Sequence, residues 1–255
     1  MKMNRLVLTL SFVLFLAFPA RSQDEEKIQK LFQDAIQAMG GDAYMKVTDI
    51  VSEGNLFFFN RDGDSSGLIK FNDYTKFPDK SRFELGNRKK ARDVTVFNLE
   101  KNEGWILEGQ KETRAATAEE MKSFKDAIKH SLDMILRFRY KDPNNRLFYL
   151  GPGEGADVRL EAVKILDPEN DEVTLYFDRA GKLPAKIEYR TINRRGIALR
   201  EVEEYSQWLV AQGINTPLRT DHYQNGFKSS QQFIVKITYN NNLPDSFFVK
   251  PEPPK

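Results

Sequence analysis

The sequence of 255 residues contains no cysteine. A disulfide framework, a thiolate zinc site, a cysteine nucleophile and a lipid-modified N-terminal cysteine are therefore all excluded. A chain without disulfides must be held together by burial alone. Its length is sufficient for one sizeable core or a large single β domain.

The sequence also has almost no net charge once its first residues are set aside. Residues 1–22 contain three basic side chains (Lys2, Arg5 and Arg21) and no acidic ones. The remaining 36 basic and 37 acidic side chains nearly cancel. The charge balance therefore gives no support for a nucleic-acid partner or an anionic membrane surface, and we expect neither.

Long hydrophobic runs are rare. The one clear example covers residues 6–18 and follows the basic residues Lys2 and Arg5. Its 13 residues are too few to span a bilayer comfortably, and small residues at Ala20 and Ser22 suit a signal-peptidase site. We predict a cleaved signal peptide over residues 1–22 and a mature single domain over residues 23–255. A membrane anchor is the alternative interpretation of this run.

Catalytic signals are equally scarce, because the chain has only two histidines, no glycine-rich phosphate loop before a helix and no H-E-x-x-H motif. Gly63 to Gly67 do spell G-x-S-x-G, the pattern of a hydrolase nucleophile elbow. That elbow needs a helix after the serine, whereas Leu68-Ile69-Lys70-Phe71 is typical of a strand. We expect a non-enzymatic protein, with a hydrolase using Ser65 as the alternative.

The same segment approximates a calcium loop, because Asp62, Asp64, Ser66 and Gly67 match its first, third, fifth and sixth positions. The twelfth position is Asp73 where a glutamate is normal, and both flanks resemble strands. Polar turn residues between two apolar runs favour a hairpin. We therefore predict no cofactor and no metal site, and incidental calcium binding over residues 62–73 stays open.

Hydrophobic periodicity predicts two helices. The first covers residues 24–39, where apolar residues recur every three or four positions before Gly40-Gly41. The second begins with a capping box, Thr117 with Glu120, and continues to about residue 138. Its apolar stripe comprises Met121, Phe124, Ile128, Leu132, Ile135 and Phe138, and His130 is expected on its polar side.

Alternating patterns between turn signals predict strands elsewhere. We expect them over residues 50–59, 67–74, 81–85, 94–99, 105–107, 158–165, 173–177, 186–190, 198–205, 216–224 and 232–239. In the last of these, Phe233, Val235, Ile237 and Tyr239 are expected on one face. Short strands with short connections favour an antiparallel sheet. Residues 201–208 could alternatively form a helical turn.

Four stretches resemble the periplasmic lipoprotein carriers, the LolA/LolB-like family, and in particular its divergent outer-membrane lipoprotein-sorting members. They are the end of the first helix at Ala38-Met39-Gly40-Gly41, the segment Ser52-Glu53-Gly54, the hairpin VTLYFDRAGKLPAKIEY (173–189) and the closing part from residue 214 to residue 251. The resemblance implies a mainly β fold with helices (α+β). In that fold an incomplete antiparallel β-barrel, or curved sheet, surrounds a hydrophobic cavity covered by amphipathic helices.

The resemblance further implies a non-catalytic periplasmic protein that binds lipids or lipoprotein acyl chains. The partners would then be inner- or outer-membrane lipoprotein-sorting proteins, and we expect a monomer. The candidate lining of the cavity is Phe57, Phe59, Trp105, Leu107, Phe124, Ile128, Leu132 and Ile135. The same residues could instead form a filled sandwich core. An envelope protein-binding or sensor module of the same fold, without a lipid, is the alternative function.

Overall fold

Thirteen antiparallel strands in one continuous sheet organise this chain. The structure is a computed structural model and describes residues 23–88, 92–109, 112–153, 159–193 and 195–253. The predicted signal peptide therefore lies outside the described residues. The strands are β1 (Asp49–Phe58), β2 (Ile69–Lys76), β3 (Lys80–Leu85), β4 (Asp93–Asn98), β5 (Glu103–Leu107), β6 (Arg114–Ala115), β7 (Arg146–Pro152), β8 (Leu160–Leu166), β9 (Glu172–Asp178), β10 (Pro184–Ile192), β11 (Ala198–Ala211), β12 (Ile214–Gln224) and β13 (Phe227–Tyr239).

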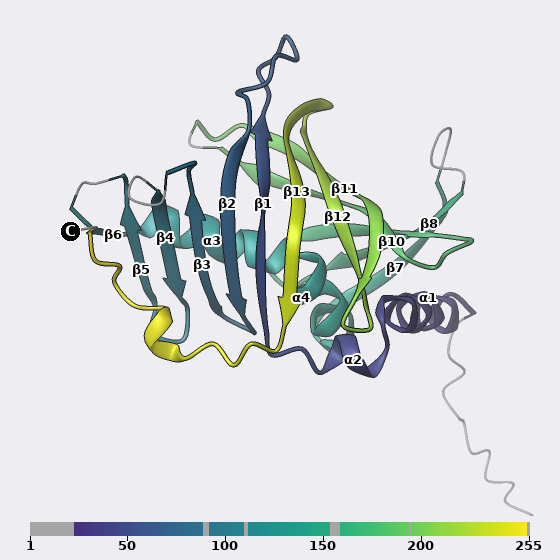
Figure 1. Cartoon of the computed structure of the whole chain (residues 1–255). Coiled ribbons are helices and arrows are strands. Elements are labelled where there is room, and N and C mark those ends of the chain that lie inside the picture. The colour runs from purple at the N-terminus through teal and green to yellow at the C-terminus, as the bar shows by residue number, and fades with distance from the viewer. Residues whose placement is uncertain (1–22, 89–91, 110–111, 154–158, 194, 254–255) are drawn as a thin grey trace, which may run out of the picture.

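The strand order is β6-β5-β4-β3-β2-β1-β13-β12-β11-β10-β9-β8-β7. Strands β1 to β6 and strands β7 to β13 each pair in sequence order, and the pairing of β1 with β13 joins the two halves. The sheet curves strongly but is not closed, because β6 and β7 form its two edges (Figure 1). The expected fold class, a curved antiparallel sheet with helices, is confirmed. No helix in the described parts of the chain is long and apolar enough to cross a membrane.

Helix α1 (Gln23–Met39) confirms the first predicted helix. It buries Ile28, Phe32, Ala35 and Met39, which lie on one face at helical spacing. The ring of Phe32 stacks on Tyr140 at 4.5 Å between centroids. Gly40 and Gly41 then end the helix with positive φ angles of 129° and 57°. A Cβ on Gly40 would lie 2.6 Å from the Gly213 carbonyl oxygen, so only glycine fits there.

The second predicted helix is interrupted. Thr117 and Glu120 form the predicted capping box at the start of α3 (Ala118–His130), but Ser131 is extended, with φ −65° and ψ 146°. Ser131 then caps α4 (Leu132–Arg137) by accepting a hydrogen bond from the Met134 amide. Leu132 and Ile135 of α4 still face the interior, whereas Phe138, directly after α4, is 45% exposed, in contrast to our expectation.

Two strands and one bulge were not predicted. The strands are the two-residue β6 and the edge strand β7. Strand β7 includes Gly151 and Pro152, which resemble a loop in sequence but are tolerated in an edge strand. Strand β13 has an extra residue, Val235, between the partners of Glu53 and Gly54. This bulge turns Val235 outward, 73% exposed, so that the expected alternation along β13 is wrong beyond this point. Residues 201–208 are strand, as part of β11.

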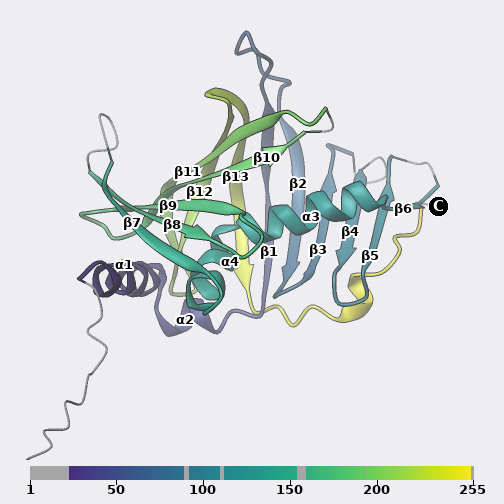
Figure 2. The ribbon, with the colours of Figure 1, turned by 180° about the vertical axis from the view of Figure 1, so that it is seen from behind.

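The short helical elements complete the described chain. They are α2 (Asp42–Met45) and the 3-10 turns η2 (Arg139–Lys141) and η4 (Asp245–Phe247). Figure 2 shows α3 lying across one face of β1 to β5, while α1 and α2 lie below the other half of the sheet. In Figure 1 the segment after β13 (yellow) runs along the lower ends of the strands and then rises beside β5.

The apolar core has two parts. The larger cluster joins α1, α2 and α4 to strands β8 to β10, and Phe32, Ile135 and Leu175 are completely buried within it. The smaller cluster lies where the C-terminal segment covers β4 and β5, with Phe248 packed against Val96 and Leu107. In the middle of the sheet, only the ends of β1 and β13 take part in the larger cluster, through Ile50, Ile237 and Tyr239.

Arg137 of α4 binds the segments that meet beneath the larger core. Its guanidinium donates hydrogen bonds to the carbonyl oxygens of Tyr44 (2.7 Å) and Val47 (2.9 Å) and to the Asp133 carboxylate (3.1 Å). It also lies over the rings of Tyr44 and Phe77, 4.5 and 4.4 Å from their centroids. The residue is only 6% exposed, and each of its three guanidinium nitrogens has a hydrogen-bond partner in the protein.

We expect Arg137→Ala to lower the free energy of unfolding by about 3–5 kcal/mol, because it removes the buried cation and leaves carbonyl oxygens without donors. Urea unfolding followed by circular dichroism measures this. Lys30→Ala, which removes the exposed Lys30–Asp34 ion pair, is the control and should change stability by less than about 1 kcal/mol. Equal effects of the two substitutions would contradict the role given to Arg137.

Candidate functional site: a cavity beneath the helices

The segment with the G-x-S-x-G pattern forms the predicted hairpin. It connects β1 to β2, and Phe59 and Ser65 face each other as an isolated antiparallel bridge. The Asn60 side chain accepts hydrogen bonds from the amides of Asp62 (3.0 Å) and Asp64 (2.9 Å), which shapes the turn. Strand β2 follows Ser65, whereas a nucleophile elbow needs a helix at this place.

The other residues that a hydrolase or a calcium loop would need lie away from this hairpin. His130 Nε2 lies 2.9 and 3.0 Å from the two carboxylate oxygens of Asp171. His130 also stacks on Tyr189 and is 3% exposed, so the expected polar position is wrong. Asp73 lies within β2, in register with Ser52 of β1, rather than in the turn. Among the described residues, no group of three or more acidic or histidine side chains could hold a metal ion.

A cavity of about 490 Å³ lies between the middle of the sheet and helices α3 and α4. This volume is within the range of pockets that take small ligands. The helices supply an apolar wall formed by Phe124, Ile128, Leu132 and Met134. Phe124 is held in place because its ring stacks on Phe97 of β4 at 4.0 Å. The sheet forms the opposite wall, which has a different character.

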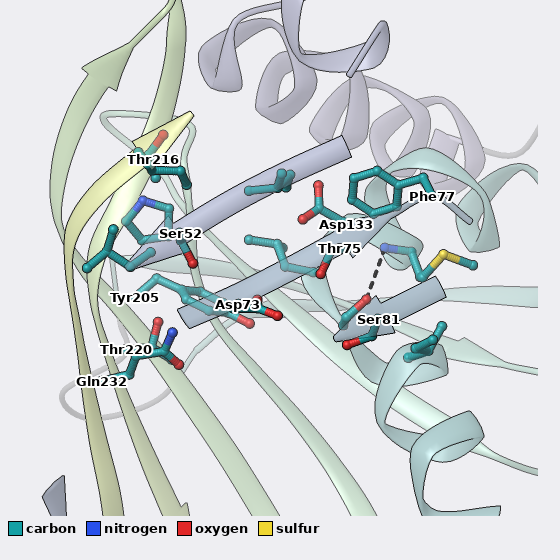
Figure 3. Close-up of a pocket in the computed structure, with 18 of the residues that line it drawn as sticks. Ser52, Asp73, Thr75, Phe77, Ser81, Asp133, Tyr205, Thr216, Thr220 and Gln232 are labelled. Atoms are coloured by element: carbon teal, nitrogen blue, oxygen red, sulfur yellow. Dashed lines mark hydrogen bonds between the residues drawn. The ribbon is translucent and has the colours of Figure 1, made fainter. Parts of the chain in front are cut away.

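Polar side chains cross the sheet side of the cavity (Figure 3). We call them the polar floor, and its members come from β3, β2, β1, β13 and β12: Ser81, Thr75, Asp73, Ser52, Gln232 and Thr220. The cross-strand register places Thr75 opposite Ser81, Asp73 opposite Ser52, and Thr220 opposite Gln232. The cavity is thus amphipathic, with an apolar helical wall and a floor that can form hydrogen bonds.

Asp73 is the carboxyl group at the centre of this floor. Burial raises the pKa of Asp73 to about 7, and the backbone amide of Tyr74 offsets this only in part. Within the described residues, no side chain donates a hydrogen bond to this carboxyl group, and no cation pairs with it. A carboxyl group in such a place favours its neutral form until a donor or cation approaches.

A second carboxyl group, that of Glu203 on β11, extends the floor and is already satisfied. It accepts hydrogen bonds from the hydroxyls of Tyr189 (3.2 Å) and Tyr205 (2.9 Å). The Nδ1 atom of His222 lies 3.6 Å from Glu203. Burial and the nearby Glu203 charge raise the pKa of Tyr205 well above its usual range, so its hydroxyl keeps the proton that it donates.

The predicted lining residues do not all meet at this cavity. Phe124, Ile128 and Leu132 line it together. Ile135 is completely buried in the larger core. Phe57 contacts Phe233 on the face of β1 opposite Ser52, since successive strand residues point to opposite faces.

The remaining three predicted residues lie farther from the helical wall. Phe59 is at the β1–β2 hairpin, where the Lys228 ammonium lies 5.2 Å from its ring centroid. Trp105 pairs with Val96 across β4 and β5 and packs with the smaller core. Leu107 belongs to the same cluster. Trp105 and Leu107 therefore face the C-terminal segment, on the other side of the sheet from Asp73.

The polar floor is the part of the site that the sequence interpretation missed. A signal for it was present, because Asp73 shares the two-residue period of Phe71 and Thr75, which predicts an inward side chain. Residues on distant strands, such as Thr220 and Gln232, carry no such local sign. Their place depends on the β12–β13 register.

Comparison with known proteins identifies the fold. No protein-family model and no curated protein matches the sequence. Solved structures do match: a LolA superfamily protein from Nitrosomonas europaea has a TM-score of 0.56 and 12% sequence identity, over 87% of this chain and 97% of that one. A DUF1329 family protein from Desulfovibrio piger has a TM-score of 0.58 at 12% sequence identity, over 87% of this chain and 97% of that one.

A third structure, a domain from Vibrio parahaemolyticus provisionally named an outer-membrane lipoprotein-sorting protein, has a TM-score of 0.53 at 13% identity. It covers 88% of this chain and 96% of that chain. The chain therefore has a divergent LolA-like fold, as the sequence resemblance implied. At these identities the likeness concerns the fold.

The raised pKa of Asp73 predicts a pH-dependent stability. In the unfolded chain the Asp73 carboxyl group loses its proton near its usual pKa of 3.8, whereas in the folded protein it keeps the proton up to about pH 7. The stabilisation from the proton is therefore complete below about pH 4 and is lost as the pH rises through 7. We expect the Tm of Asp73→Asn, relative to that of the unmodified protein, to rise by at least about 3 °C between pH 5 and pH 8. A difference that is constant over this range would mean that Asp73 has an ordinary pKa.

Proposed function

We propose that this protein is a periplasmic binding protein for lipids or lipoprotein acyl chains, and that it acts as a non-catalytic carrier in outer-membrane lipoprotein sorting. The observation that carries the proposal is the cavity between the sheet and helices α3 and α4, with its wall of Phe124, Ile128 and Leu132. A buried acyl chain gains about 0.8 kcal/mol for each methylene group removed from water. Several methylenes against this wall would therefore offset the cost of ordering a bound chain.

Similarity of fold to a LolA superfamily protein and to a provisionally named lipoprotein-sorting domain supports the same proposal. The apolar run at residues 6–18 supports export, and hence the periplasmic location. Inner- or outer-membrane components of lipoprotein sorting would be the partners. The chain would act as a monomer, because a cavity within one sheet needs no second copy.

A second function, binding of another envelope protein without a lipid, is favoured by strand β7. This strand forms one edge of the sheet, and Phe148 and Leu150 on it are 39% and 51% exposed. An added strand could pair with the free edge of β7 while its side chains cover these two residues.

Native mass spectrometry separates the two functions. The chain from Gln23 onward is purified from the periplasm without detergent and then extracted with solvent. The carrier function predicts additional mass in the lipid range that is lost on extraction. A protein that stays free of added mass, and takes up neither phospholipid nor lipopeptide when these are added, would contradict the carrier function and favour the edge of β7.

A substitution that fills the cavity tests where the acyl chain binds. Ala127 and Ala118 are both exposed residues of α3, but only Ala127, beside the apolar wall, lines the cavity. We expect Ala127→Trp to weaken binding of an acyl probe at least about tenfold, because the indole takes the place of several methylenes. Ala118→Trp is the matched control and should bind normally. Equal affinities of the two variants would place the acyl site elsewhere.

A further inference from the structure

The floor of the cavity carries more hydrogen-bonding capacity than an acyl chain can use. Within the described residues, the side chains of Ser52, Thr75, Ser81, Thr220 and Gln232 form no hydrogen bond with the protein, although they line the cavity. Unpaired polar groups that line a cavity of this kind bind either water or polar atoms of a ligand. A ligand that fills the cavity therefore needs a polar part on the sheet side.

The charged side chains around the cavity indicate which charge the polar group of the ligand carries. The acidic and basic side chains that line the cavity are Asp73 (β2), Lys80 (β3), Asp133 (α4), Glu203 (β11) and His222 (β12). Of these, four already have partners. Lys80 pairs with Glu100 at 2.6 Å, Asp133 with Arg137 at 3.1 Å, and Glu203 with its two tyrosine hydroxyls and the nearby His222.

Asp73 is left as a carboxyl group that faces the cavity without a cation among the described residues. It is flanked in the register by the hydroxyl groups of Ser52 on β1 and Thr75 two residues along β2. A primary ammonium group has three donors and one positive charge, so it can pair with the carboxylate and still donate to hydroxyl oxygens nearby. A carboxylate or phosphate head group would instead meet Asp73 and Glu203 as like charges.

We propose that the cavity selects amphiphiles whose polar group is a primary ammonium, bound at Asp73 with the apolar chain against Phe124, Ile128 and Leu132. This inference rests on the proposed lipid-binding function and names the chemical class that the site prefers. The raised pKa of Asp73 fits the inference, because a bound cation would lower that pKa and offset the free-energy cost of burying the carboxylate. A neutral or anionic amphiphile would leave that cost in place.

The test compares three probes of equal chain length on the purified chain at pH 8, where Asp73 is ionised: dodecylammonium, dodecanol and dodecanoate. Affinities are measured by competition against one fluorescent acyl probe below the micelle concentration. We expect dodecylammonium to bind at least about tenfold more tightly than dodecanoate, the ratio typical of one charge-assisted hydrogen bond. Asp73→Asn should reduce this ratio to less than about threefold, because it weakens the binding of dodecylammonium and relieves the like-charge repulsion of dodecanoate.

Asp42→Asn is the matched control, because Asp42 on α2 pairs with Lys46 on the surface and is far more exposed. It should retain the full preference, and Asp73→Ser replaces the asparagine variant if that variant does not fold. Equal binding of all three probes, tighter binding of dodecanoate, or a preference that survives both Asp73 substitutions would overturn the inference while leaving the carrier function in place. Binding of none of the probes would instead overturn the carrier function itself.

Discussion

The buried guanidinium of Arg137 is the interaction on which the arrangement of the helices depends. It joins α4 to the segment before β1 through the carbonyl oxygens of Tyr44 and Val47, and to the end of β2 through the ring of Phe77. These three segments are far apart in the sequence, and a cation that is satisfied by all of them allows only one relative placement. Since α4 is fixed in this way and Ser131 changes the chain direction, α3 must cross the middle of the sheet rather than continue along it.

That placement explains why the protein has a cavity instead of one continuous core. The larger core fills the space beneath α4 and α1, and the smaller one lies on the far face under the C-terminal segment. Between them, α3 faces a sheet surface that carries Asp73, Ser52 and Thr75. Apolar side chains cannot close over these polar groups without leaving them unpaired, which is costly. The polar floor thus keeps this part of the interior open.

Much of the fold follows from patterns in the sequence. The apolar spacing of α1 with its Gly40-Gly41 stop predicts that helix almost to the residue, because burial on one face and a left-handed turn are both local requirements. The β1–β2 hairpin is predictable for the same reason. The curved sheet with covering helices follows from the number of short strands and from the resemblance of the sequence to lipoprotein carriers.

The sequence was less informative where a choice depends on distant parts of the chain. The apolar period continues through Leu132 and Ile135, so nothing local indicates the break at Ser131. Both faces of β5 are covered, one by α3 and the other by the C-terminal segment, and alternation alone cannot assign Trp105 and Leu107 to the correct one. Likewise the bulge at Val235 exchanges the two faces of β13. The candidate site was therefore predicted only along its helical wall.

The pairing of β1 with β13 has a consequence for the order in which the protein forms. All other strand pairs join neighbours along the chain, but this one joins the first strand to the last. Asp73 and Ser52 lie on one side of this seam, while Gln232 and Thr220 lie on the other. Contacts between such distant segments carry the largest loss of chain entropy and form only when both ends are present. The cavity therefore cannot form until the last strand has been synthesised, because its two halves meet only when β13 pairs with β1.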